Sequence, residues 1–114
     1  MIIENFSKRT ILAKHVVIAN NIFSRLKGLL GTKSLKECSA LIIKPCSSIH
    51  TYFMQYDIDV IFVDKQNKVL AALDGMAPFK ISKVYFNAAF CIEFPAGTIK
   101  KTSTNIGDTI IFGQ

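Results

Sequence analysis

The sequence predicts a small, mainly β protein, an antiparallel β-barrel or sandwich of six to eight short strands with one amphipathic helix packed on it. Three observations lead to this fold class. Apolar runs are short and turn-forming residues are frequent, as in strands. Only one stretch, at about residues 21–30, has helical spacing. The chain has 114 residues, of which 50% are hydrophobic, so we expect one domain, residues 1–114, around one core.

The N-terminal half is predicted to place strands on both sides of the helix. Ile2-Ile3 can pair with an early strand over Ile11–Ile18, which is β-branched and apolar around Lys14-His15. Ala40–Lys44 reads as a short buried strand that ends at Pro45. The helix is predicted because its apolar residues share one face. These residues are Ile22, Phe23, Leu26, Leu29 and Leu30.

The C-terminal half is predicted to consist almost entirely of strands. Ile58–Val63 is apolar on both faces apart from Asp59, as expected of a central strand. A turn at residues 65–68 leads into a partner strand over Val69–Leu73, and Asp74-Gly75 begins a loop. The remaining predicted elements are strands over Lys83–Asn87, Ala88–Phe94 and Thr109–Phe112, with one helical turn allowed within Thr98–Asn105.

Composition limits the classes of partner and the compartment. The net charge is +6, but the lysines are dispersed, so a solvated surface is favoured over a nucleic-acid site. No apolar run reaches the roughly 18 residues that span a bilayer. The start lacks the features of a signal peptide, so we expect a cytoplasmic protein, or a mature domain without its leader. Cys38, Cys46 and Cys91 are odd in number and are expected to be reduced thiols.

The segment from Cys46 to Asp64 is the most informative for function, because it places polar groups directly before the most apolar strand. His50 can act as a base, a ligand or a pH sensor, or it can be a structural histidine. Cys46 lies four residues before His50, but this spacing in an irregular loop does not establish a Cys-His pair. The cysteines and histidines lack the spacing of a zinc site, so no metal or cofactor is expected.

Asp59 and Glu93 each interrupt an apolar strand, and a buried carboxylate without partners would cost several kcal/mol. Arg25, at the border of the helix's apolar stripe, is one partner that could reach Asp59. If Asp59, Glu93 and His50 converge, they form an acidic pocket suited to a cationic ligand. If they diverge, each is a local anchor of the fold. Both alternatives are open from the sequence.

Five segments, in order, carry a resemblance to a known family. They are Arg25–Gly31, Cys46–Met54, Ile58–Asp64 with Lys68-Val69, Cys91–Gly97 and Gly107-Asp108, with Pro78 between the third and fourth. They resemble the pattern of domain of unknown function 192, a family of bacteria and archaea. Phe53 and Phe79 stand where that family often has tryptophan. The resemblance implies a mostly antiparallel β-barrel or sandwich closed by a helix, and it implies no reaction.

Three functional hypotheses follow. The first is a binding module that holds a small ligand or a protein partner. Its proposed binding residues are Arg25, His50, Thr51, Phe53, Met54, Asp59 and Glu93. The second is a hydrolytic or metal-assisted enzyme that uses His50 with Asp59 or Glu93. The third is a weak polyanion-binding protein that acts through its basic surface.

Overall fold

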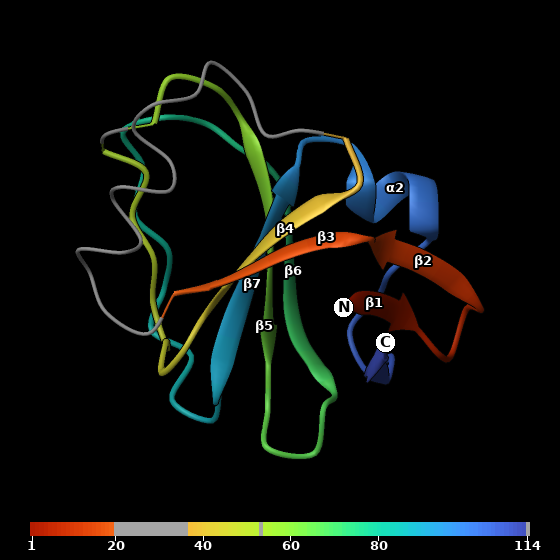
Figure 1. Cartoon of the computed structure of the whole chain (residues 1–114). Helices are drawn as coiled ribbons and strands as arrows, with labels where there is room; N and C mark the ends of the chain where they lie inside the picture. Colours follow the sequence, from red (N-terminus) through yellow and green to blue (C-terminus); the bar gives the residue numbers. More distant parts are fainter. Residues whose placement is uncertain (20–36, 53, 114) are drawn as a thin grey trace.

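Figure 1 shows the computed structural model of the chain, which describes residues 1–19, 37–52 and 54–113. The predicted helix at about residues 21–30 lies outside the described residues. Within them the elements are β1 (Ile2–Asn5), β2 (Thr10–Ala13), β3 (His15–Ala19), β4 (Ser39–Ile43), β5 (Ile58–Val63), β6 (Val69–Met76), β7 (Phe90–Pro95), α2 (Thr98–Thr102) and β8 (Ile110–Gly113). No helix in this part of the chain is long and apolar enough to cross a membrane.

The strands form two sheets, which confirms the mainly β, sandwich-like fold. The order is β2-β1-β8 in the smaller sheet and β3-β4-β7-β5-β6 in the larger one. Among the described residues these sheets do not close into a single barrel. Both chain ends belong to the smaller sheet, where β1 pairs with β8 (Figure 1). One pair departs from the antiparallel expectation, because β3 and β4 run parallel.

The central strands of the larger sheet are buried on both faces. One face packs against the smaller sheet and α2 through a core that includes Ile3, Leu12, Ile61, Phe94 and Ile99. The other face carries a second apolar cluster, to which the loop after β4 contributes Cys46, Ile49 and Met54. All six residues of β5 are buried, which explains why this strand reads as a continuous apolar run.

The predicted early strand over Ile11–Ile18 is in fact two strands in different sheets. The chain changes sheets at Lys14, where the backbone N–H groups of Lys14 and His15 both donate to the carbonyl of Cys38, at 2.8 and 3.1 Å. Ala13 and Lys14 weaken the β-propensity in the middle of this run, and the pairing of the second half with β4 places it in the other sheet.

Two further predictions were wrong. Lys83–Asn87 is not a strand: Tyr85 N–H instead donates to the carbonyl of Ser47 at 2.7 Å, in a loop that follows residues 47–49. The expected loop at Asp74-Gly75 lies inside β6, which continues to Met76. The other predicted strands are confirmed, and most of their ends differ from the prediction by one or two residues. The predicted helical turn after Gly97 is α2.

Candidate functional site

Asp59 is a fully buried carboxylate whose two oxygens accept hydrogen bonds from three backbone N–H groups. Oδ1 accepts from Gly75 at 2.9 Å. Oδ2 accepts from Gly97 at 3.1 Å and from Ile99 at 2.8 Å. The carboxylate therefore joins the end of β6 to the start of α2, where helical N–H groups have no partner within the helix.

A bulge in β6 creates the need for this carboxylate. Val60 pairs with Leu73 and Ile58 pairs with Met76, so Asp74 and Gly75 both stand opposite Asp59. Gly75 has a φ of 70°, which glycine adopts without steric cost. The extra residue leaves its N–H outside the ladder, and Asp59 accepts it. The geometry of Asp59 is that of a structural anchor.

Glu93 is buried on the opposite face of the same sheet. In the β5–β7 pairing Asp59 is opposite Phe94, and Glu93 is opposite Val60. Because paired residues share a face and successive residues alternate, Asp59 lies on the face toward α2 and Glu93 on the other. The two carboxylates do not converge on one pocket.

His50 and Thr51 both lie beside the segment that follows β6. His50 forms an isolated antiparallel bridge with Ile81, and its ring stacks on Tyr52 with centroids 4.9 Å apart. His50 is half-buried, and its Nδ1 atom is buried. This strand-like bridge positions the histidine next to residues that the sequence did not single out.

Thr51 fixes the course of residues 77–80. Its hydroxyl donates to the carbonyl of Ala77 at 2.6 Å and accepts from the N–H of Lys80 at 2.9 Å. Its own N–H donates to the carbonyl of Lys80, and its carbonyl accepts from Phe79 N–H. A residue that makes so many backbone contacts within one loop is a clamp, so Thr51 positions Phe79 and Lys80.

The exposed apolar segment, residues 79–86, displays large side chains to solvent. Phe79, Ile81 and Phe86 are 73%, 66% and 89% exposed, and Val84 is also exposed. Lys80 and Lys83 stand between them. Four exposed large apolar side chains within eight residues make this segment a candidate interaction surface.

A groove of about 430 Å³ lies between β6 and this segment. Its lining is Ala72, Leu73, Asp74, Met76, Lys80, Ile81, Ser82, Lys83 and Tyr85. Leu73, Met76 and Tyr85 also pack on the second core cluster, so the floor of the groove is continuous with the core. Its volume falls in the range of ligand sites.

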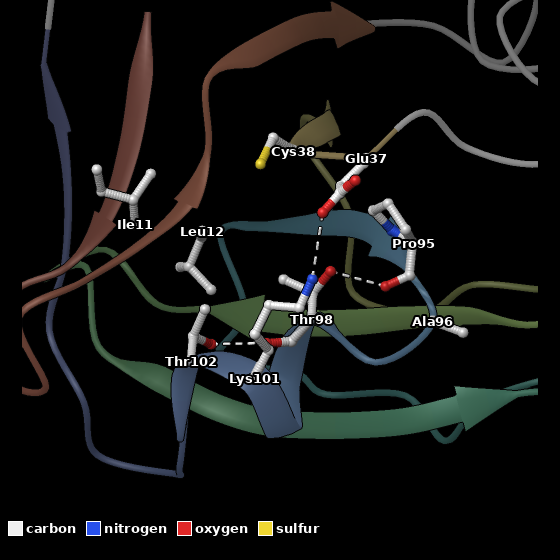
Figure 2. Close-up of a pocket in the computed structure, with 9 residues that line it drawn as sticks. All are labelled: Ile11, Leu12, Glu37, Cys38, Pro95, Ala96, Thr98, Lys101 and Thr102. Carbon is white, nitrogen blue, oxygen red and sulfur yellow. Dashed lines mark hydrogen bonds and ion pairs between the residues drawn. The ribbon is translucent and has the colours of Figure 1, made fainter.

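Figure 2 shows a second, smaller cleft of about 180 Å³ between β2, α2 and the turn before β4. Glu37 forms a 3.5 Å ion pair with Lys101. The hydroxyls of Thr98 and Thr102 donate to the carbonyls of Pro95 and Thr98. Because its polar groups already pair with one another and its volume is below the usual range, we favour the groove along β6.

The predicted binding residues are thus distributed over several places. His50 and Thr51 adjoin the segment that borders the groove, Met54 is in the second core cluster, and Asp59 and Glu93 are on opposite sheet faces. Arg25 and Phe53 lie outside the described residues. In the described ranges no three histidine, cysteine or acidic side chains are grouped as metal ligands. That these residues bind a ligand remains a prediction.

Sequence reasoning missed Ile81 as a groove residue. The available signal was the run from Phe79 to Phe86, in which apolar residues are interspersed with lysines directly after Pro78. The second half of this run falls in the strand predicted over Lys83–Asn87, and that prediction directed attention away from a surface role. Only the hydrogen bonds to residues 47–51 show that this run stands outside the sheet.

Relatives of this chain carry the name UPF0127 protein. A "UPF0127 protein" of Thermococcus sibiricus is 32% identical over 110 residues, covering 93% of this chain and 71% of its own length. A UPF0127 protein of Pyrococcus horikoshii is also 32% identical, over 95% of this chain and 96% of its own length. Two solved structures share the fold.

The first of these structures is a protein of unknown function from Novosphingobium aromaticivorans. It has a TM-score of 0.78 and 16% identity, and covers 97% of this chain and 82% of that one. The second is from Sinorhizobium meliloti and is described as a "putative transcription regulator". It has a TM-score of 0.78 and 18% identity, and the match covers 96% of this chain and 89% of that one. At such identity the likeness shows the fold alone.

The family model described as "Uncharacterized ACR" matches residues 3–112, nearly the whole chain. The segments that resembled this family are spread over the same range, and two relatives at 32% identity span almost all of the chain. The protein therefore belongs to the DUF192 family, whose function is uncharacterised.

Proposed function

We propose that this protein is a binding module that takes an extended segment of a partner protein in the groove between β6 and the exposed apolar segment. The observation that carries the proposal is the groove itself, with an apolar floor and a rim of exposed large side chains. Apolar side chains of a partner would gain burial on Leu73, Met76 and Ile81.

The position of β6 favours an extended partner. β6 stands at the edge of the larger sheet as far as the described residues show. Residues 107 and 108 hydrogen-bond to Val69 at one end, and the bulge at Asp74-Gly75 interrupts the strand at the other. Between them, residues 70–73 offer a short edge to which a strand can add, with every second side chain of that strand directed to the groove.

The charge of the rim favours an acidic partner. Lys80 and Lys83 line the groove, and Asp74, its one acidic lining residue, lies 3.8 Å from Lys100. The chain as a whole carries a net charge of +6. A partner segment that alternates acidic and apolar residues would match both the lysines and the apolar floor.

The test is selection from a randomised peptide library displayed on phage. Wild-type protein should enrich peptides that alternate apolar residues with aspartate or glutamate. Ile81→Asp, and separately the double variant Lys80→Glu with Lys83→Glu, should bind an enriched synthetic peptide roughly tenfold more weakly. Phe6→Asp is the matched control for Ile81→Asp, because the apolar side chain of Phe6 is 62% exposed, close to the 66% of Ile81, and does not line the groove.

Amide chemical-shift changes in NMR spectra locate the bound peptide. They should concentrate in residues 70–76 and 79–86. Enrichment that is equal for wild-type and Ile81→Asp protein would refute the proposal, and so would shifts centred elsewhere. Association with anionic lipid vesicles that depends on Ile81, without any enriched peptide, would replace the protein partner with a membrane surface.

The enzyme hypothesis gains nothing from the carboxylates. Asp59 already accepts three backbone hydrogen bonds, which occupy both of its oxygens, so it is poorly suited to act with His50. Glu93 lies on the other sheet face, and its pairing with His50 stays a prediction. A binding role is therefore the function that the arrangement supports best.

A further inference from the structure

Cys46 and Cys91 are in direct contact although they are 45 positions apart in the sequence. Their Sγ atoms lie 3.1 Å apart, about 1 Å longer than a disulfide bond. Cys46 follows β4 in the loop that contributes to the second core cluster, and Cys91 is the second residue of β7. Both are reduced, as is Cys38, which is exposed at the smaller cleft.

The surroundings of the pair make it suited to closure. Ile43, the last residue of β4, pairs with Cys91, so the loop that carries Cys46 three residues later leaves the sheet beside Cys91. The thiol of Cys46 also contacts the carbonyl of Ser48 at 3.1 Å, which fixes the loop beside Cys91. Cys46 is 8% exposed and Cys91 is 0% exposed, so an oxidant from solvent meets Cys46 first.

We propose that Cys46 and Cys91 are a modification site that hydroperoxides convert to a reversible intramolecular disulfide. In the first step the Cys46 thiolate attacks the terminal oxygen of the hydroperoxide. The O–O bond breaks and Cys46 becomes a sulfenic acid. The remaining oxygen takes up the proton that the Cys46 thiol released and leaves as an alcohol, or as water when the oxidant is hydrogen peroxide. In the second step the Cys91 thiol attacks the Cys46 sulfur, the S–O bond breaks, and water leaves with the Cys91 proton.

The balance is two thiols and one hydroperoxide to one disulfide, one alcohol and one water. The peroxide is reduced by two electrons, one from each sulfur. The contact between the sulfurs means that closure needs side-chain rotation and little backbone movement. The disulfide would tie the loop that carries Thr51 to the central strand β7, and this inference does not depend on the proposed binding function.

The experiment uses the full chain with Cys38→Ser, which removes the exposed thiol and its intermolecular reactions. After treatment of the folded protein with hydrogen peroxide, its intact mass should fall by two hydrogen atoms. Proteolysis should yield one peptide pair joining Cys46 to Cys91, and dithiothreitol should restore both thiols. The urea midpoint of the oxidised protein should rise, because the cross-link restricts the unfolded chain.

Two variants in the same background separate the steps. Cys91→Ala should stop at a Cys46 sulfenic acid, which dimedone labels. Cys46→Ala should leave Cys91 unlabelled, because it is fully buried. Circular dichroism checks that both fold, and if either does not, the mass change of the parent protein decides alone. The proposal fails if the cross-link forms only in urea, or if Cys46 passes to sulfinic acid while Cys91 stays reduced.

Discussion

Asp59 of β5 and Glu93 of the neighbouring strand β7 face opposite sides of the larger sheet. Asp59 is opposite Phe94 in the β5–β7 ladder, and Glu93 precedes Phe94, so the two side chains project in opposite directions. Each is almost fully buried. The two carboxylates therefore serve separate layers of the molecule, and each has to be tested on its own.

Replacement of Asp59 should destabilise the fold. Asp59→Asn replaces one accepting oxygen with an NH2 donor, which then faces either the N–H of Gly75 or those of Gly97 and Ile99, and it loses the charge of a buried acceptor. We expect a loss of about 3–5 kcal/mol in the free energy of unfolding, measured by urea denaturation. Asp57→Asn is the control, because Asp57 is exposed, and it should change stability by less than about 0.5 kcal/mol. An Asp59→Asn variant as stable as Asp57→Asn would contradict the anchor role.

Asp108 should make stability depend on pH. Burial tends to raise the pKa of this carboxyl, but hydrogen bonds from Asn5, Lys8 and the Asn105 N–H, with the charge of Lys8, lower it below its usual value. The folded state then binds fewer protons than the unfolded state near the unfolded pKa of about 3.9. The stabilisation is complete above that pH and is lost as pH falls through the folded pKa.

The measurement is the difference in unfolding free energy between wild-type protein and Asp108→Asn as a function of pH. This difference should be largest near neutral pH and should shrink as acid protonates the carboxylate. A difference that stays constant into the acid range would mean that the charge of Asp108 is not responsible.

Removal of the Thr51 hydroxyl should loosen residues 77–80. Thr51→Val keeps the shape of the side chain but leaves the carbonyl of Ala77 and the N–H of Lys80 without this partner. The expected cost is about 1–3 kcal/mol, with faster hydrogen exchange at the Lys80 amide. Thr51→Ser keeps the hydroxyl and should retain the protection. Equal protection in the two variants would show that the hydroxyl does not clamp the loop.

Substitution of Gly75 should destabilise the fold because of the backbone conformation at this position, and not because of a steric clash. A Cβ at this position would meet nothing within 4 Å, but the φ of 70° is in the left-handed region. Gly75→Ala should therefore cost about 1–2 kcal/mol in unfolding free energy. Gly113→Ala is the matched control, since its Cβ also meets nothing and its φ is outside that region. Similar losses at both sites would point to a cause other than backbone conformation.

Several features could be predicted from local sequence. β5 and the hairpin that follows it were predicted with the correct strand start and turn, because an apolar run, a polar turn and a second apolar run are local signals. The need of Asp59 and Glu93 for partners was also predictable, because burial of a carboxylate is costly whatever the fold. The bulge was missed because Asp74-Gly75 is equally typical of a loop.

The sequence by itself determined that the protein is small and mainly β, that it belongs to a recognisable family, and that residues 46–64 combine polar groups with an apolar strand. The tertiary structure alone decided that Asp59 and Glu93 diverge, that Thr51 clamps residues 77–80, and that Cys46 contacts Cys91. The physical reason is that alternation along a strand determines only which side chains of that strand share a face. Which side chains meet depends on the register between strands, which is set by pairing of distant segments.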